Sequence, residues 1–266
     1  MILSIVTINL NNLRGLRRTL DSVLSQDSDH YEWIIIDGGS SDGSTELIEQ
    51  HKQYVHYWES KPDRGLYHAM NKGLEKTTGE YIIFLNSGDC FCDESIVSDF
   101  CVSRPSADVI YGNTIFVDRD NKEVGRSNSP EYLRLSHFWH KGGLVHQSTF
   151  FSKNCFKRYH YNEHNQIASD TELYMHLLYD GYSFIKWDRF VARFEIGGKS
   201  SIYNDGREFN SIINRVLPPG VKADYDEIIQ NRDVDLYILI RKIINSKRWV
   251  RNIARAILFP FRLFLK

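Results

Sequence analysis

Three carboxylates stand at positions where an acid can do chemistry. Asp37 closes the apolar run WIIID, Asp89 follows the run YIIFLN, and Asp170 belongs to the segment SDTE. An acid beside a buried strand end must be solvated, paired or bound to a cation. Asp89 therefore has two interpretations, a turn aspartate in the segment NSGD or a ligand of a hard cation. Mg²⁺ and Mn²⁺ suit the second one, because they bind one or two carboxylates together with diphosphate oxygens.

The segment SDTE also has two interpretations. Ser169 and Glu172 match the spacing of a capping box, and Asp170 in the first turn would then favour the helix dipole. Alternatively, a carboxylate at the start of this helix accepts a proton from an incoming hydroxyl. The segment by itself leaves both interpretations open.

The segment DGGSSDGS, residues 37–44, is rich in glycine and joins a strand to a helix, which suits close approach of backbone to a ligand. Its glycine spacing is not the GxGxxG of a dinucleotide site. Asp42 either faces a ligand or caps the next helix. The segment GGKSS, residues 197–201, is not a P-loop, because Arg193 stands where that motif needs its first glycine.

The elements that position these residues alternate along the first 90 residues. Short β-branched or aromatic runs at 2–8, 33–37 and 81–86 are typical of strands buried on both faces. Helical patterns lie between them, in LRGLRRTLDSVL, STELIEQH and GLYHAMNKGLEK. This alternation predicts βαβ units on a parallel sheet, whose ligands bind beyond the carboxyl ends of the strands. Asp37 and Asp89 should therefore share one edge, which the less regular second half covers.

Composition limits the classes of function. The 266 residues allow one large α/β domain with an appendage, and 33 Lys and Arg nearly cancel 34 Asp and Glu, which argues against nucleic-acid binding through bulk charge. The four cysteines lack a paired CxxC spacing, which favours a reduced, cytoplasmic setting. The N-terminus lacks the features of a signal peptide, and no apolar run reaches the ~20 residues of a spanning helix.

The C-terminal segment 241–266 carries eight basic residues and no acid, with apolar residues at helical spacings. It predicts a basic amphipathic helix that contacts a membrane surface peripherally. The alternative is a helix that packs on the domain or in a dimer interface. The sequence is therefore also compatible with a homo-oligomer.

Taken in order, several stretches resemble the family 2 inverting nucleotide-sugar glycosyltransferases of GT-A fold. They are SIVTINLNN, LDSVLSQ, WIIIDGGSSDGS, DRGLYHAMNKGLEKTTGEYIIFLNSGD, HQSTFF, ASDTELYMHLLYDG and FEIGGKSS. The resemblance covers about residues 1–205 and is greatest to members that build bacterial capsule, O-antigen or exopolysaccharide.

This resemblance implies a GT-A, Rossmann-like α/β fold, with a mixed, mostly parallel sheet flanked by helices. It implies a transferase domain at 1–205, followed by a basic helical extension at 206–266. The partners implied are a nucleotide-sugar donor and a saccharide or lipid-linked saccharide acceptor, with Mg²⁺ or Mn²⁺ as cofactor. The location implied is the cytoplasm, with peripheral contact at the inner face of the cell membrane.

The resemblance also implies roles for single residues. Asp170 would be the general base and Asp89 would hold the metal on the diphosphate. The nucleotide site would be lined by Asn9, Asn11, Asp37, Asp63 and Asn71. Two positions depart from the family: Gly38 stands where a second acid often touches the nucleobase, which weakens the expectation of a UDP-sugar, and the metal elbow keeps a single acid in Asn86-Ser87-Gly88-Asp89.

The mechanism implied is a single displacement with inversion, in which Asp170 deprotonates the acceptor hydroxyl as it attacks the anomeric carbon. Two other classes compete with it. A nucleotidyltransferase would normally carry a basic glycine-rich loop early in the chain, whereas TINLNNLRGLRR has one glycine. A non-catalytic sugar-nucleotide binder agrees with the reduced metal elbow, but the retained Asp170 argues against it.

Overall fold

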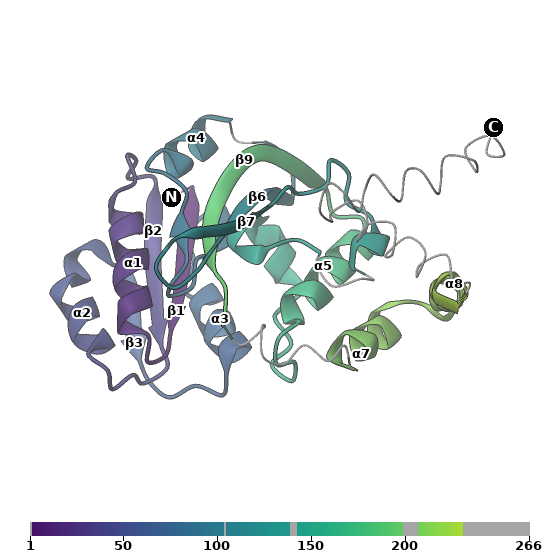
Figure 1. Ribbon diagram of the computed structural model, residues 1–266, viewed down its shortest axis with the longest axis horizontal. Coiled ribbons are helices and arrows are strands. Elements are labelled where there is room, and N and C mark those ends of the chain that lie inside the picture. The colour runs from purple at the N-terminus through teal and green to yellow at the C-terminus, as the bar shows by residue number, and fades with distance from the viewer. Residues whose placement is uncertain (1, 104, 139–142, 199–206, 231–266) are drawn as a thin grey trace, which may run out of the picture. The chain divides into compact units, whose positions relative to one another are not determined.

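The computed structural model describes residues 2–103, 105–138, 143–198 and 207–230 (Figure 1). The chain divides into two compact units, Met1–Ile212 and Ile213–Lys266. The amphipathic segment expected at 241–266 lies outside the described residues, so its membrane contact stays a prediction. None of the described helices combines the length and the apolar character needed to cross a membrane.

Strands and helices alternate in the first part of the chain, as the sequence predicts. The elements there are β1 (Leu3–Asn9), α1 (Leu13–Leu24), β2 (Tyr31–Asp37), α2 (Ser44–Gln50), η1 (Lys52–Tyr54), β3 (Tyr57–Ser60), α3 (Leu66–Leu74), β4 (Tyr81–Phe84), β5 (Cys90–Phe91) and α4 (Ile96–Ser103).

The second part is richer in strands and short 3₁₀ turns. Its elements are β6 (Val109–Val117), β7 (Glu123–Ser127), η2 (Leu135–Phe138), η3 (His146–Ser148), β8 (Thr149–Ser152), η4 (Lys153–Lys157), α5 (Ser169–Tyr179), β9 (Phe184–Glu195) and α7 (Arg207–Val216). Helix α8 (Pro219–Gln230) follows in the second unit.

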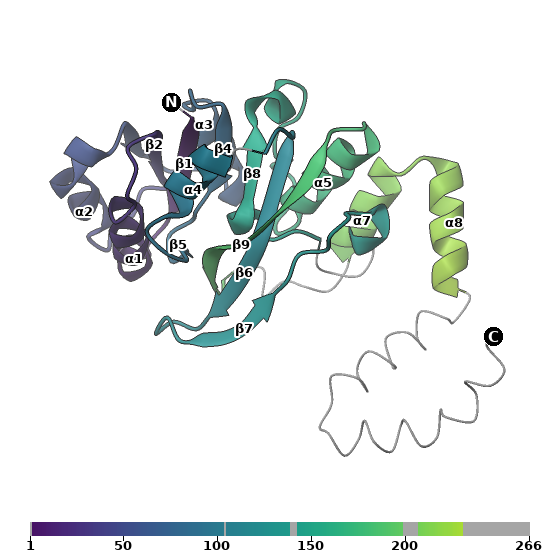
Figure 2. The same ribbon diagram turned by 90° about the horizontal axis from the view of Figure 1, so that it is seen from above.

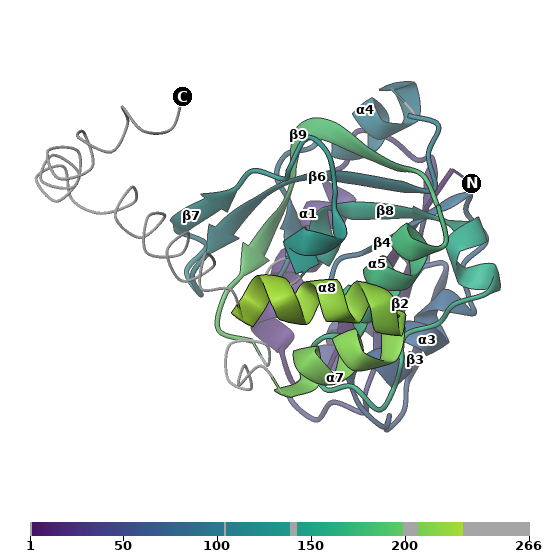
Figure 3. The ribbon, with the colours of Figure 1, turned by 90° about the vertical axis from the view of Figure 1, so that its right-hand side faces the viewer.

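The strands form one mixed sheet in the order β3-β2-β1-β4-β8-β6-β9-β5, with β7 paired to β6. The first four strands are parallel, and β8 is antiparallel to both of its neighbours. Long, curved β9 runs beside β6 in parallel (Figure 3). Its far end pairs with the two-residue β5. This pairing carries the end of β9 back to the loop that follows β4.

Each face of the sheet buries a different set of side chains. Ile5, Trp33 and Ile83 are neighbours in register and pack in one cluster with apolar residues of α1, α2 and α4. Val6 and its register partner Ile34 lie on the opposite face, toward α3 (Figure 2). Each fully buried side chain of this size contributes about 1.5–3 kcal/mol. The fully buried strands explain why their sequences are continuously apolar rather than alternating.

Candidate active site

The carboxyl ends of β1 and β2 bring two of the predicted nucleotide-site residues together. Asn9 and Asp37 are register partners, and the Nδ2 of Asn9 donates to the Oδ1 of Asp37 over 2.7 Å. Both side chains are buried. Among the described residues, the Oδ1 of Asn9 is buried without a hydrogen-bond partner, so a polar oxygen remains unpaired at this edge.

Asp37 organises the turn that follows β2. Its carboxylate accepts from the Oγ of Ser40 and of Ser60, each over 2.6 Å, and from the backbone N–H of Gly39 and Ser40. Burial alone would raise the pKa of Asp37, but these bonds together lower it below its ordinary value. Asp37 is therefore an ionised acid whose oxygens are largely engaged within the protein.

Asn11 and Asp42 fix the rest of this turn. Asn11 has a positive φ of 49°, accepts from the N–H of Ser41 and donates its own N–H to Ser40. Asp42 accepts from the N–H of Ser44 near the start of α2 and from the N–H of Leu13 at the start of α1. Asp42 thus accepts from backbone N–H groups at the starts of both α1 and α2, although the N-cap residue of α2 is Gly43.

Asp63 lies against Gly38. A Cβ at position 38 would be 2.7 Å from the Oδ2 of Asp63, so only glycine allows this carboxylate to lie there. The other oxygen of Asp63 accepts from the N–H of Gly65, just before α3. Gly38 stands where the family often has a second acid. Because it has no side chain, it leaves room for the carboxylate of Asp63 from another segment.

Asn71 lies in α3. Its amide donates to the carbonyl of Tyr161 over 2.9 Å and accepts from the N–H of the same residue over 3.0 Å. It also donates to Glu163. These contacts join α3 to the segment before α5, and the role of Asn71 at the nucleotide stays a prediction.

Helix α1 holds the elbow between β4 and β5. Asn12, the N-cap of α1, donates to the carbonyl of Ser87 over 2.9 Å. The Oγ1 of Thr19 accepts from the N–H of Gly88 and donates to the carbonyl of Asp89. Gly88 has a φ of 109°, a conformation that side chains rarely adopt, so glycine makes the elbow possible. The side chain of Asp89 is therefore presented by a fixed backbone.

Asp89 is a buried carboxylate with two donors. It accepts from the Nε2 of Gln147 and from the N–H of Glu195, each over 3.1 Å. The pKa of Asp89 is raised from 3.8 to about 6, chiefly by burial. The nearby His146 and these two bonds lower the pKa in part, and the charge of Glu195 raises it. Because these donors offset only part of the burial penalty on the ionised form, a cation would suit this place.

The residues present fit a hard divalent cation. Asp89 supplies a carboxylate, and among the described residues the Oδ1 of Asn86 on the same elbow is buried without a partner. In the described part of the chain, no three His, Cys, Asp or Glu side chains gather as a metal cluster. A cation held by one acid and completed by oxygens of a ligand agrees with both observations.

The end of β9 closes the elbow from the other side. Glu195 pairs with Arg18 of α1 over 2.7 Å, and these side chains are 21% and 16% exposed. Because the N–H of the same Glu195 bonds Asp89, the long strand and α1 converge on this carboxylate.

His146 joins the elbow to the start of α5, a contact that the sequence did not reveal. Its Nε2 lies 3.3 Å from the Nδ2 of Asn86, and its Nδ1 lies 3.3 Å from the Oδ2 of Asp170. The side chains of His146 and Asp170 are 15% and 18% exposed. Asp89 and Asp170, predicted separately, thus border one site.

The capping box, one of the two interpretations of the SDTE segment, does not form at the start of α5. The N-cap is Ala168, and the Oγ of Ser169 accepts instead from the N–H of Asn162. Glu172 accepts from the side-chain amides of Asn162 and Asn165. The local motif is lost because these two side chains bind the preceding loop.

Glu208 of α7 binds the backbone that leads into α5, up to its N-cap Ala168. Its carboxylate accepts three successive backbone N–H groups, from Gln166 over 2.9 Å, Ile167 over 3.0 Å and Ala168 over 2.8 Å. A negative charge at a helix start satisfies orphan donors and complements the helix dipole. The sequence assigned Glu208 to the C-terminal extension, whereas its contacts lie in the first unit.

We expect Glu208→Ala to lower the free energy of unfolding by about 1–2 kcal/mol, because three backbone N–H groups at and just before the N-cap of α5 lose their acceptor. Glu208→Gln keeps one acceptor oxygen and should lose less. Asn210→Ala, at an exposed position of the same helix, is the control. Urea unfolding curves measure the differences, and a Glu208→Ala variant as stable as the control would contradict this role of Glu208.

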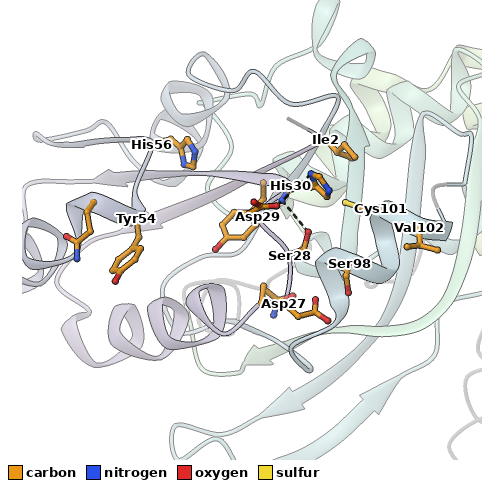
Figure 4. A pocket seen from close by; sticks show the side chains of 13 residues that line it. Ile2, Asp27, Ser28, Asp29, His30, Tyr54, His56, Ser98, Cys101 and Val102 are labelled. Atoms are coloured by element: carbon orange, nitrogen blue, oxygen red, sulfur yellow. Dashed lines mark hydrogen bonds and ion pairs between the residues drawn. The ribbon is translucent and has the colours of Figure 1, made fainter.

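A large cavity lies away from this site. It has a volume of about 960 Å³ at the amino ends of the parallel strands, with Ile2, His30 and His56 among its lining residues (Figure 4). A smaller cavity of about 480 Å³ lies between residues 64–67 at the start of α3 and residues 163–167 before α5. Only the smaller one adjoins the segments that carry Asp63 and Asp170, so the larger cavity has no part in the chemistry considered below.

Comparison with known proteins gives a consistent result. Residues 4–167 match the family model described as Glycosyl transferase family 2. An uncharacterized glycosyltransferase of Mycobacterium tuberculosis is 40% identical over 96 residues, which cover 36% of this chain and 37% of that protein. A PGL/p-HBAD biosynthesis glycosyltransferase of Mycobacterium bovis is 25% identical over 162 residues, 58% of this chain and 60% of that protein. The chain thus spans between about a third and three fifths of these relatives.

Solved structures share the fold at low sequence identity. Staphylococcus aureus TarS 1-349 in complex with UDP-GlcNAc has a TM-score of 0.66 and 16% identity, covering 81% of this chain and 65% of that one. Mannosyltransferase PcManGT from Pyrobaculum calidifontis, in complex with GDP-Man and Mn²⁺, has a TM-score of 0.63 and 14% identity, covering 98% of this chain and 82% of that one. At these identities the likeness shows the fold alone.

Proposed function

The chain belongs to glycosyl transferase family 2, and on that premise we propose that it is an inverting glycosyltransferase. It moves a sugar from a nucleotide-sugar donor to a hydroxyl of a saccharide acceptor. The GT-A fold and the family expected from the sequence are both confirmed.

One observation supports this function more than any other. The elbow that carries Asp89 and the helix start that carries Asp170 are joined through a single side chain, His146. A buried acid suited to a cation and a partly exposed acid suited to proton transfer therefore lie on two sides of one site. A single displacement needs these two functions close together, one at the leaving group and one at the attacking hydroxyl.

Asp170 performs the proton transfer in the proposed mechanism. Its carboxylate accepts the proton of the acceptor hydroxyl while the oxygen bonds to the anomeric carbon of the donor. The bond from that carbon to the diphosphate breaks on the opposite face, so the configuration inverts and the nucleoside diphosphate leaves with the electron pair. The carboxylate is held for this step by His146 at Oδ2 and by the N–H of Thr171 at Oδ1.

Asp89 would hold a divalent cation, Mg²⁺ or Mn²⁺, whose charge stabilises the leaving diphosphate. Asn9, Asn11, Asp37 and Asp63 border the nucleotide side of the same edge. Asp37 keeps the turn after β2 in place, whereas Asp63 has one oxygen directed at the space next to Gly38.

The acceptor is proposed to be a lipid-linked saccharide of a cell-surface polymer. Support comes from relatives named for PGL/p-HBAD biosynthesis and, for a Bacillus subtilis protein 33% identical over 91 residues, for teichuronic acid biosynthesis. The working location is the cytoplasm, at the inner face of the membrane. Capsule, O-antigen and exopolysaccharide are the product classes proposed.

A ligand screen tests the donor half of the proposal. A ligand that binds only the folded state raises the melting temperature, so UDP-, GDP- and dTDP-sugars are compared with and without Mn²⁺. We expect one nucleotide class to stabilise the protein, and more so with the cation. Release of nucleoside diphosphate from that donor then separates a transferase from a sugar-nucleotide binder, whereas release of pyrophosphate from a nucleoside triphosphate and a sugar phosphate would indicate a nucleotidyltransferase.

The basic segment 241–266 is proposed to bring the enzyme to a lipid-linked acceptor. Basic residues near an anionic surface contribute about 1 kcal/mol each, so the full chain should float with vesicles containing anionic lipid and should be released by high salt. Deletion of 241–266 should abolish flotation without changing donor stabilisation. Equal flotation of the shortened chain would remove the membrane role.

A further inference from the structure

Within the described part of the chain, the side chain of His146 contacts both Asn86 on the elbow and Asp170 on α5. Its ring is largely buried in the short turn η3, directly before Gln147, which donates to Asp89. Two neighbouring residues of one turn therefore contact the two acids of the site, His146 at Asp170 and Gln147 at Asp89. The single turn η3 therefore contacts both Asp89 and Asp170 and holds them near each other.

The orientation of the Asn86 amide decides which ring nitrogen carries the proton. The Nδ2 of Asn86 is a donor, so the Nε2 that faces it must accept. A neutral imidazole that accepts at Nε2 is protonated at Nδ1, and this N–H faces the Oδ2 of Asp170, which accepts. The same orientation of the Asn86 amide leaves its Oδ1 buried and unpaired within the described part of the chain.

We propose that His146 is a positioning residue of the transfer reaction, which rests on the proposed function. Its Nδ1–H holds the carboxylate of Asp170, and its Nε2 holds the amide of Asn86 on the elbow. The ring fixes the distance between the proton acceptor and the elbow, and it turns the Oδ1 of Asn86 away from itself, toward a ligand. His146 itself forms no bond to the sugar and takes no proton from it.

The second oxygen of Asp170 shows why this anchor matters. Its Oδ1 accepts from the N–H of Thr171, the next residue of the same helix. The other oxygen, Oδ2, must be held in place by a contact from outside the helix. Among the hydrogen bonds of the described residues, that of His146 is the one that reaches the Oδ2 of Asp170 from another element. Loss of alignment at a reacting group by about 1 Å can cost about 10²-fold in rate.

Two substitutions separate the roles of the two ring nitrogens. Asparagine at 146 places its amide near the position of Nδ1, and glutamine places its amide near the position of Nε2. We expect His146→Ala to lower kcat about 10- to 100-fold, with the KM for donor changed less than about 3-fold. His146→Asn should recover most of this loss, whereas His146→Gln should stay near the alanine value.

The matched control is His56→Asn, at the amino edge of the sheet, where the ring accepts from the N–H of Trp33. It should leave kcat unchanged. Better recovery by glutamine than by asparagine, a raised KM with an unchanged kcat, or a wild-type kcat for His146→Ala would each overturn the positioning role.

A measurement that needs no turnover tests the contact itself. Long-range ¹H–¹⁵N spectra of the histidine rings, with the His146 signals assigned from their loss in His146→Gln, report which nitrogen is protonated. We expect the Nδ1–H form, and a shift of these signals in Asp170→Asn. An Nε2–H ring with a bare Nδ1 would overturn the inference. If the parent binds and turns over no donor, the proposed transferase function fails, but these spectra still decide the contact of His146.

Discussion

Asp170→Asn is expected to lower kcat by about 10²- to 10⁴-fold, the range that a positioned general base contributes. A sugar hydroxyl is too weak an acid to attack unaided at neutral pH, and asparagine has no site for the proton. The KM for donor should change little, since donor binding is assigned to the opposite side of the site. Turnover of the donor identified by the ligand screen is the measurement.

The structure makes this substitution a clean test. Asparagine retains an oxygen for the N–H of Thr171, and Glu208 holds the backbone that leads into α5 whichever residue stands at 170. Removal of the first-turn charge costs about 0.3–1 kcal/mol, a small loss next to the expected loss of turnover.

Asp180→Asn at the other end of α5 is the control with the same charge change. Asp180 pairs with Arg158 and bonds Tyr159, outside the site. Its variant should keep parental turnover. If Asp170→Asn also turned over within a few-fold of the parent, the base would have to be sought at Glu172 or Glu195. Glu172 is bonded to Asn162 and Asn165, and Glu195 is paired with Arg18.

The edge of the sheet could be predicted from the sequence because its causes are local. The runs of β1, β2 and β4 are continuously apolar because each strand is covered on both faces, and parallel strands present their carboxyl ends together. That reasoning alone predicts that Asp37 and Asp89 share one edge. Family membership confirms the interpretation of the ordered motifs, while the single-residue roles remain predictions.

The groups that complete the site could not be predicted, because their partners are far apart in the chain. His146 is 24 residues from Asp170 and 60 from Asn86, and Glu208 is 40 residues from Ala168. A lone histidine or a lone glutamate has no local pattern that indicates such partners. The capping box does not form for a related reason, because the Oγ of Ser169 accepts from the N–H of Asn162 in the preceding loop. Local sequence patterns therefore predict a contact correctly only where the residue's partner in the folded protein is also close to it in the sequence.

Asp89→Asn is expected to abolish cation-dependent donor binding and, at the same time, to stabilise the cation-free protein. The first effect follows because a neutral amide is a weak ligand for a hard cation at a site with a single acid. Mn²⁺ should raise the melting temperature of the parent with donor and leave that of the variant unchanged. Full activity of the parent in excess chelator would remove the metal assignment.

The second effect follows from burial. Because the pKa of Asp89 is raised to about 6 in the folded protein, the folded state binds this proton more tightly than the unfolded state does. The stability from this group is therefore fully present below about pH 4 and is lost as the pH rises through about 6. At pH 7 in chelator the ionised carboxylate costs up to about 3 kcal/mol, at 1.36 kcal/mol for each unit of pKa.

Asparagine cannot ionise, so Asp89→Asn should unfold at higher denaturant than the parent at pH 7 in chelator, and the two should converge near pH 4. Asp29→Asn removes the same charge at a fully exposed side chain and should show no such pH-dependent gain. A variant less stable than the parent at pH 7, without the cation, would show that Gln147 and the N–H of Glu195 already satisfy the carboxylate. A gain in stability coupled to a loss of donor binding is the behaviour of a residue retained for its ligand at the expense of the fold.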